Sequence, residues 1–288
     1  MAAIGSGKHI YCEKPIGLSG AEAAEIATAA NAAGIKSLTG YTYLRNPLVG
    51  LARRLIEQGE LGRIVQFRGV HNEDYLSDIG APFTWRCDPE TAGKAGALGD
   101  LGSHILSIAL HLAGDIQAVS GNTRIVTAER PVARGAAQYR KVGNDDVALA
   151  LLNFSNGAVG TIEASRIATG SKMGISYEIA GTEGALRFDG ERGNELQFYS
   201  NRDPQDRRGF RRIYGNAEHQ PYGNLSPGPG HGFSFNDHKT IEILELMELV
   251  AADRVPLSNL KTGAAIGRVL DAILDSAERR DWVELIQR

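Results

Sequence analysis

The stretch Gly99-Asp100-Leu101-Gly102-Ser103-His104 leads directly into an apolar run at residues 105–110. If this segment is a helix, Asp100 and His104 lie one turn apart on the same face, with Cβ atoms about 6 Å apart. A carboxylate beside an imidazole fixes its tautomer and favours its protonated form. The pair therefore predicts proton transfer if it faces a pocket. Taken alone, it also fits a solvated Asp and a hydrogen-bonded core His on an amphipathic helix.

Composition and charge narrow the class of protein. The chain has 288 residues, of which 42% are hydrophobic and 23% charged, and a net charge of -3 without a basic run. That length is sufficient for a large core, in two domains or in one sheet domain plus a fragment. Two cysteines cannot build a disulfide framework, and no apolar run approaches a membrane span. The first eight residues lack the basic-then-apolar pattern of a signal peptide. We expect a cytoplasmic protein without nucleic-acid or membrane partners.

The first 45 residues have a strand–helix–strand pattern. Residues 8–12 and 35–43 are predicted strands, and the segment 21–33 between them is a predicted helix capped by Ser19. Such a unit forms parallel strands joined by a crossover helix. The tripeptide Glu13-Lys14-Pro15 follows the first strand, at the sheet edge where α/β proteins bind ligands. As an isolated motif it is also typical of a surface Lys beside a turn.

Residues 46–288 have a different pattern, which predicts an antiparallel sheet with helices. The segments 147–154 and 158–164 flank Ser155-Asn156-Gly157, and a second hairpin joins 177–180 to 185–189. Helices are predicted at 48–58, from Asp100 to near Gly114, at about 237–252 and at 262–279. A Gly- and Pro-rich loop spans 221–235, and residues 282–286 form a last short strand. The fold class is therefore α/β (α+β).

Ordered motifs in this chain resemble those of the glucose–fructose oxidoreductase / inositol dehydrogenase / MocA (Gfo/Idh/MocA) family. The matching text is GKHIYCEKP at residues 7–15, GYTYLRNP at 40–47, GELG at 59–62, WR at 85–86 and GALGDLGSH at 96–104. The resemblance runs essentially along the whole chain. It implies a Rossmann-type remnant at residues 1–45. It also implies a C-terminal domain at 46–288 with a large, mostly antiparallel open sheet, covered by helices on one face.

The resemblance implies hydride transfer between NAD or NADP and a hydroxyl of a sugar or cyclic polyol. By the same resemblance, Lys14, Asp100 and His104 converge on that hydroxyl. His104 takes the proton, Asp100 orients the imidazole, and Lys14 bonds the same oxygen, although the base can also be Lys14. The expected cofactor contacts are Glu13, Lys14, Pro15, Tyr43, Trp85 and Arg86. The expected substrate contacts are Arg86, Arg166 and His231. Trp85 and Arg86 also fit a simple cation–π surface pair.

The sequence departs from the family pattern in two respects. Ser107 stands where the family often has an Asp, and no G-x-G-x-x-G follows a strand. The phosphate-binding part of a Rossmann domain is therefore not evident, which leaves NAD and NADP undistinguished. We expect a fragment of a dehydrogenase or a chain completed by another. The alternative is a cofactor-free pseudoenzyme, or a sugar-binding or assembly protein. His111 shares a helix face with His104, but the further ligands of a metal site are missing, so no metal is expected.

The antiparallel sheet predicts the assembly. A sheet covered on one face by helices often buries its other face against a partner. Residues 147–154 carry apolar side chains on both sides of the strand. We therefore expect a homodimer or homotetramer formed through the sheet face.

Overall fold

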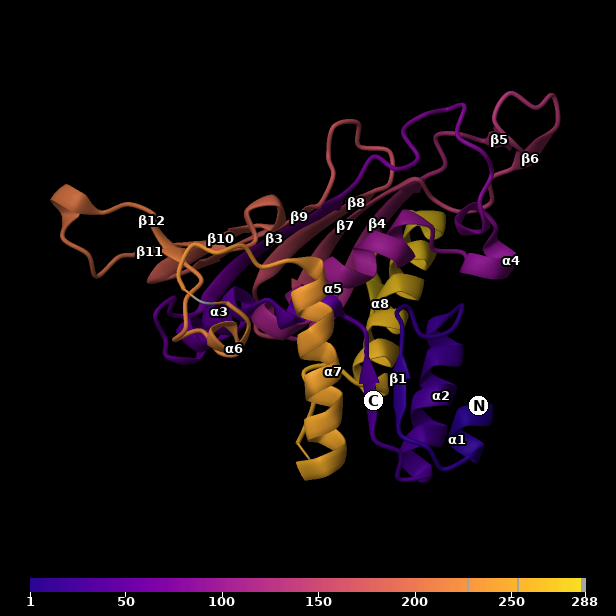
Figure 1. The fold of residues 1–288 in the computed structure, drawn as a ribbon. Coiled ribbons are helices and arrows are strands. Elements are labelled where there is room, and N and C mark those ends of the chain that lie inside the picture. The colour runs from indigo at the N-terminus through magenta and orange to yellow at the C-terminus, as the bar shows by residue number, and fades with distance from the viewer. Residues whose placement is uncertain (227, 253, 286–288) are drawn as a thin grey trace.

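The computed structural model describes residues 1–226, 228–252 and 254–285, which form a broad sheet with helices packed on one side (Figure 1). The sheet has nine strands in the order β12-β11-β10-β9-β3-β8-β7-β4-β13. Its neighbouring strands are antiparallel except for β3 and β8, which run parallel. The nine strands are β3 (Ile64–Asn72), β4 (Ile116–Arg124), β7 (Val147–Phe154), β8 (Val159–Ser165), β9 (Gly174–Gly181), β10 (Gly184–Asp189), β11 (Glu195–Ser200), β12 (Arg211–Tyr214) and β13 (Val283–Glu284).

The helices that cover the sheet lie beneath it in Figure 1, and the upper face is open. Contacts with the sheet come mainly from α3 (Pro47–Glu57), α5 (Ser103–Ala113) and α8 (Leu260–Arg279). The remaining helical segments are α4 (Pro89–Ala92), α6 (Tyr222–Leu225), α7 (Phe235–Ala252), η1 (Thr42–Arg45), η2 (Trp85–Cys87), η4 (Gly190–Arg192) and η5 (Gln205–Arg207). Strands β5 (Glu129–Pro131) and β6 (Tyr139–Lys141) form a separate hairpin. The predicted one-sided arrangement is confirmed.

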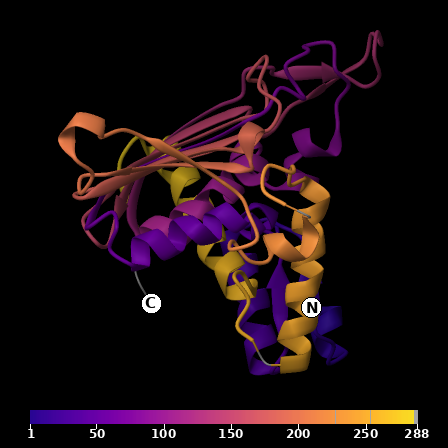
Figure 2. The same cartoon turned by 60° about the vertical axis from the view of Figure 1, so that its left-hand side comes forward.

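The N-terminal unit contains α1 (Ala2–Gly5), β1 (Ile10–Cys12), α2 (Gly20–Ala32) and β2 (Ser37–Thr39). Strands β1 and β2 pair in parallel, as predicted. The Ser19 side chain caps α2 by accepting a hydrogen bond from the amide of Glu22. Helix α7 runs beside this unit, below the sheet (Figure 2). The carboxyl end of β1 therefore faces α7 and the helices under the sheet.

Helices α2 and α8 join the N-terminal unit to the rest of the molecule. They approach so closely that a Cβ on Gly20 would lie 2.7 Å from the backbone of Gly267. Only a residue without a side chain allows this approach. Because α8 also packs against β4, it positions β1 relative to the large sheet.

Some predicted boundaries shift in the structure. The second predicted strand ends at Thr39, because residues 42–45 turn into a 3₁₀-helix, and β4 was not predicted. The helix predicted from Asp100 starts at Ser103, after a π-helical turn, η3 (Leu98–Gly102). Of the predicted last strand, Ile286 lies outside the described residues. Within the described ranges, no helix is long and apolar enough to cross a bilayer.

Candidate active site

Lys14 and Asp100 meet in the structure although 86 positions separate them. Lys14 follows β1, and the Lys14–Pro15 peptide bond is cis. The Lys14 ammonium donates to the backbone oxygen of Asp100 at 2.5 Å and to its Oδ1 at 2.9 Å. An ammonium carries three donors, so one proton is left for another acceptor. The predicted convergence of these two residues is thus present in the fold.

Asp100 has three side-chain partners. Besides Lys14, the Tyr75 hydroxyl donates to Oδ2 at 2.9 Å, and Arg86 Nε donates to it at 3.2 Å. Burial alone would raise the pKa of Asp100, but the charge and hydrogen bond of Lys14 outweigh it and, with Tyr75 and Arg86, lower this pKa to about 2. The carboxylate stays ionised and does not act as a proton acceptor.

The expected pairing of Asp100 with His104 is not what the structure shows. No hydrogen bond joins them among the described contacts, because both Asp100 oxygens are occupied by residues from other segments. The two residues also straddle the junction between the π turn and α5 rather than sharing a regular α-helix. π turns inside helices are frequent at functional sites. Asp100 therefore orients Lys14 directly, not the imidazole.

The π turn is held from outside the helix. Asp145 accepts hydrogen bonds from the amides of Gly96 at 2.7 Å and Leu98 at 2.8 Å. A Cβ on Gly96 would lie only 2.1 Å from the backbone oxygen of Asp145, so glycine is required there. The segment before β7 thereby determines where Asp100 is placed.

His104 lies beside this pair in an aromatic setting. Its side chain packs against the Tyr43 ring, with ring centroids 4.6 Å apart, and only 7% of the residue is exposed. Nδ1 is buried without a partner; Nε2 makes no hydrogen bond but is not completely buried. Burial first, and then the charge of Lys14 and the neighbouring His71, hold the pKa of His104 well below its ordinary value. The ring is neutral at physiological pH, with Nε2 open to a ligand.

The other expected cofactor contacts surround this cluster. The Tyr43 hydroxyl donates to the sulfur of Met173 at 3.5 Å. Glu13 accepts from the Lys239 ammonium and from the Tyr11 hydroxyl, both at 2.9 Å. The second carboxylate oxygen of Glu13 has no hydrogen bond among the described contacts.

Trp85 and Arg86 fit both interpretations of the sequence, as a cation–π pair and as residues beside the site. The Arg86 guanidinium lies 4.5 Å from the Trp85 ring centroid, which is the cation–π pair. The same guanidinium bonds Asp100, and the Trp85 side chain remains exposed. Arg86 is therefore part of the cluster, and Trp85 borders it.

The other two expected substrate contacts, Arg166 and His231, make no described hydrogen bond to Lys14, Asp100 or His104. Arg166 is only 1% exposed. Its guanidinium bonds Asp146 at 2.9 Å and the backbone oxygen of Arg86 at 3.0 Å, so it supports Arg86 from inside the protein. His231 is exposed, and its backbone oxygen accepts from the Tyr222 hydroxyl at 2.7 Å. None of its described contacts reaches Lys14, Asp100 or His104.

The sequence missed residues that the fold adds to the site. Tyr75 bonds Asp100 from an irregular segment that has no recognisable pattern. His71 is buried on β3, and its Nδ1 lies 3.0 Å from the backbone oxygen of Leu101. Lys239 reaches Glu13 from the first turn of α7. Only spatial proximity identifies these three residues.

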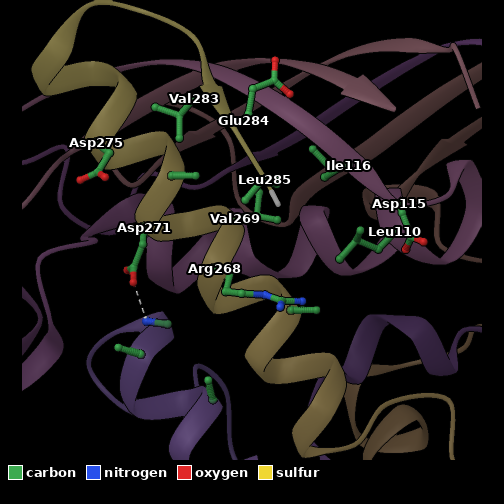
Figure 3. A pocket seen from close by; sticks show the side chains of 15 residues that line it. Leu110, Asp115, Ile116, Arg268, Val269, Asp271, Asp275, Val283, Glu284 and Leu285 are labelled. Carbon is green, nitrogen blue, oxygen red and sulfur yellow. Dashed lines mark hydrogen bonds between the residues drawn. The ribbon is translucent and has the colours of Figure 1, made fainter. Parts of the chain in front are cut away.

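Elsewhere the surface carries grooves without comparable chemistry. Figure 3 shows one of about 710 Å³ between α2, α8 and β13, where Asp271 accepts a hydrogen bond from the amide of Gly20 at 2.8 Å. Its acidic residues Asp271 and Asp275 do not converge on a cation. In the part of the chain that the structure describes, no three His, Cys, Asp or Glu side chains are grouped to hold a metal ion.

The chain is similar in sequence to known proteins. A family model described as the GFO/IDH/MocA C-terminal domain matches residues 49–187. Levoglucosan dehydrogenase of Pseudarthrobacter phenanthrenivorans is 36% identical, with an alignment that covers 100% of this chain and 76% of that protein. The scyllo-inositol 2-dehydrogenase (NAD(+)) of Bacillus subtilis is 32% identical over 63% of this chain and 48% of its own length.

The chain is also similar to solved structures. Levoglucosan dehydrogenase in complex with NADH and L-sorbose has a TM-score of 0.96 at 37% identity, and this chain covers 76% of it. An inositol dehydrogenase homolog from Azotobacter vinelandii, complexed with NADH and myo-inositol, has a TM-score of 0.79 at 23% identity over 99% of this chain and 73% of that one. The second likeness concerns the fold alone.

Proposed function

The chain belongs to the GFO/IDH/MocA family, and from this premise we propose that it oxidises a hydroxyl of a sugar or cyclic polyol with NAD as the hydride acceptor. The observation that carries the proposal is the convergence of Lys14, Asp100 and His104. Levoglucosan dehydrogenase is aligned over the whole chain, which favours a dehydrogenase over the cofactor-free alternative. NAD rather than NADP is proposed because levoglucosan dehydrogenase was solved in complex with NADH.

The residues present fit the reacting end of such a cofactor and its substrate. When bound, the nicotinamide supplies the hydride chemistry. The His104 ring is neutral and its Nε2 is unbonded, so it can accept the proton of the substrate hydroxyl. The third proton of Lys14 can donate to the same oxygen and stabilise the charge that develops there. Asp100 keeps Lys14 in position through its two acceptors.

We also propose the two-part division of the chain. Residues 1–45 would belong to the nucleotide-binding side, which the parallel pairing of β1 and β2 supports. Residues 46–288 would form the substrate and assembly part, and the family match begins close to this boundary, at residue 49. A cytoplasmic location fits the two free cysteines, Cys12 and Cys87.

Cofactor binding and sugar oxidation test the proposal directly. We expect the 288-residue protein to quench NADH fluorescence at micromolar cofactor, and to form NADH from NAD with levoglucosan or an inositol as substrate. Replacing NAD with NADP should give weaker turnover. If NADH binds to the protein but no sugar or cyclic polyol is oxidised, the proposed reaction is wrong.

The pH dependence of turnover follows from His104. A base must be unprotonated, and the lowered pKa of His104 means that the ring is already neutral below pH 6.5. A base with the ordinary His pKa would become protonated as the pH falls through 6.5, and kcat/KM for oxidation would then drop. We expect no such drop in kcat/KM near pH 6.5. Imidazole NMR should show His104 neutral down to pH 6 or lower. A His104 resonance that titrates near pH 6.5 would contradict this assignment.

The open sheet face supports assembly into a homodimer or homotetramer. Leu149, Leu151 and Val159 are each about half exposed on this face, beside ion pairs that Glu178 makes with Arg68 and Arg187. We expect Leu151→Asp to shift the protein from an oligomer to a monomer in light scattering, because it places a charge in a buried contact. Val255 is also exposed but does not lie on the sheet face, so Val255→Asp is the matched control. A wild-type monomer at micromolar concentration would refute the interface.

A further inference from the structure

A small cavity borders the candidate active site, and among its residues only Tyr43 has been given a role. It encloses about 100 Å³, between the N-terminal end of α7 and the edge of the sheet. Its wall is mostly apolar and includes Ile108, Met173, Phe233 and Phe235, with Tyr43 on the side of the active site. The described lining contains no charged side chain.

Besides Tyr43, the polar side chains that line this cavity are Asn46 and His238. The Asn46 amide is already engaged by the backbone of Leu48 and Gly193. His238 is only 7% exposed, and neither of its ring nitrogens has a hydrogen-bond partner among the described residues. Burial lowers the pKa of His238 to about 4, so the ring is neutral and offers one donor and one acceptor. A buried polar group without a partner is destabilising, so both nitrogens favour a partner that fills the cavity. A hydroxyl, which donates and accepts, matches this pair of groups.

Tyr43 connects the cavity with the reaction centre. Its ring centroid lies 4.6 Å from that of His104 and 6.5 Å from that of His238. The Tyr43 hydroxyl bonds only the weakly accepting sulfur of Met173, so its oxygen can still accept a hydrogen bond. One aromatic ring thus separates the cavity from the proposed base.

The size and charge of the cavity limit what it can hold. A water molecule occupies about 30 Å³ in the liquid, so the cavity holds about three groups of that size. It is therefore too small for a second sugar ring. A phosphate or carboxylate would lose its hydration without meeting a cation. The nearby ammonium of Lys239 is engaged with Tyr11, Glu13 and Glu242.

We propose that this cavity is a substrate subsite that receives a neutral, hydroxyl-bearing substituent of the sugar, with His238 as its hydrogen-bonding residue. The proposal rests on the proposed function, because it assigns part of that substrate. The apolar wall contacts the carbon atoms of the substituent, and His238 and Tyr43 bond its hydroxyl. A phosphate group on this substituent is consequently excluded.

The test compares the sugar that the wild-type protein oxidises fastest with its monodeoxy analogues. We expect removal of one particular hydroxyl to lower kcat/KM of the wild type by about 10–100-fold, which corresponds to one lost hydrogen bond with an unpaired partner. His238→Phe should abolish that discrimination, and His238→Gln should restore part of it. His219→Phe, at another buried histidine, is the control. A sugar phosphorylated at that hydroxyl should not be oxidised.

A second measurement does not depend on activity. The imidazole nitrogen resonances of His238 should shift when the sugar is added, and stay unchanged with the discriminating deoxy analogue. If the sugar is oxidised but His238→Phe keeps the discrimination of the wild type, the subsite is refuted and the proposed function stands. If no sugar is bound or oxidised, the proposed function fails, and the subsite fails with it.

Discussion

Lys14→Met is expected to lower kcat/KM for sugar oxidation by about 10³-fold or more, with little loss of stability. Lys14 places one free N–H near the reacting oxygen and is anchored by the backbone and side chain of Asp100. Removing a proton-transfer group costs about 10²–10⁴-fold, and loss of a donor to a developing oxyanion costs about 10²–10³-fold. Steady-state kinetics with saturating NAD would measure the loss, and circular dichroism would confirm the fold.

Lys172→Met is the matched control for this variant. Lys172 also pairs with a carboxylate, that of Asp74, but its side chain is 75% exposed and lies outside the cluster. The control should keep wild-type turnover. If Lys14→Met kept near-normal turnover, Lys14 would have no role in the mechanism, and the reaction would depend on His104.

Arg166→Met is expected to act on stability, lowering the free energy of unfolding by about 3–5 kcal/mol. The Arg166–Asp146 pair is buried, with exposed side-chain fractions of 1% and 0%. Removing Arg166 leaves the charge of the Asp146 carboxylate without its ion-pair partner inside the protein. Urea denaturation would measure the change. The folded fraction should keep KM for the sugar within a few-fold, because Arg166 supports Arg86 only through its backbone.

Two further variants separate this effect from a general loss of charge. Arg187→Met breaks an exposed pair with Glu178 and should cost less than about 1 kcal/mol. Adding Asp146→Asn to Arg166→Met should recover part of the lost stability, because it removes the unpaired charge and keeps an acceptor for the amides of Val126 and Thr127. If Arg166→Met instead raised KM strongly without changing stability, Arg166 would be a substrate contact.

The sequence predicted the elements well where local chemistry decides them. The hairpin turns at residues 155–157 and 182–183, the Ser19 cap and the glycine after α5 were all readable from residue types. The motifs also placed Lys14 after a parallel strand and Asp100 before an apolar helix. These features depend on neighbours within a few positions, which the sequence displays directly.

The partners of each site residue could not be predicted in the same way. Asp100 was expected to pair with His104 four positions away, but it bonds Lys14, Tyr75 and Arg86, which come from other segments. Arg166 was expected at the pocket because it ends a strand, but Asp146 holds it inside the protein. Spacing along the chain does not show which of several nearby groups satisfies a charge.

The sequence by itself determined the family, many of the strands and helices in their order, and the residue types available for proton transfer. It did so because turn formers, apolar periodicity and the ordered motifs at residues 7–15, 40–47 and 96–104 are local signals. The tertiary structure alone decided which of these groups are charged and where they point. Burial beside Tyr43 keeps His104 neutral, and the bonds to Lys14 keep Asp100 ionised. Both states arise from desolvation and from contacts between distant segments, which exist only after folding.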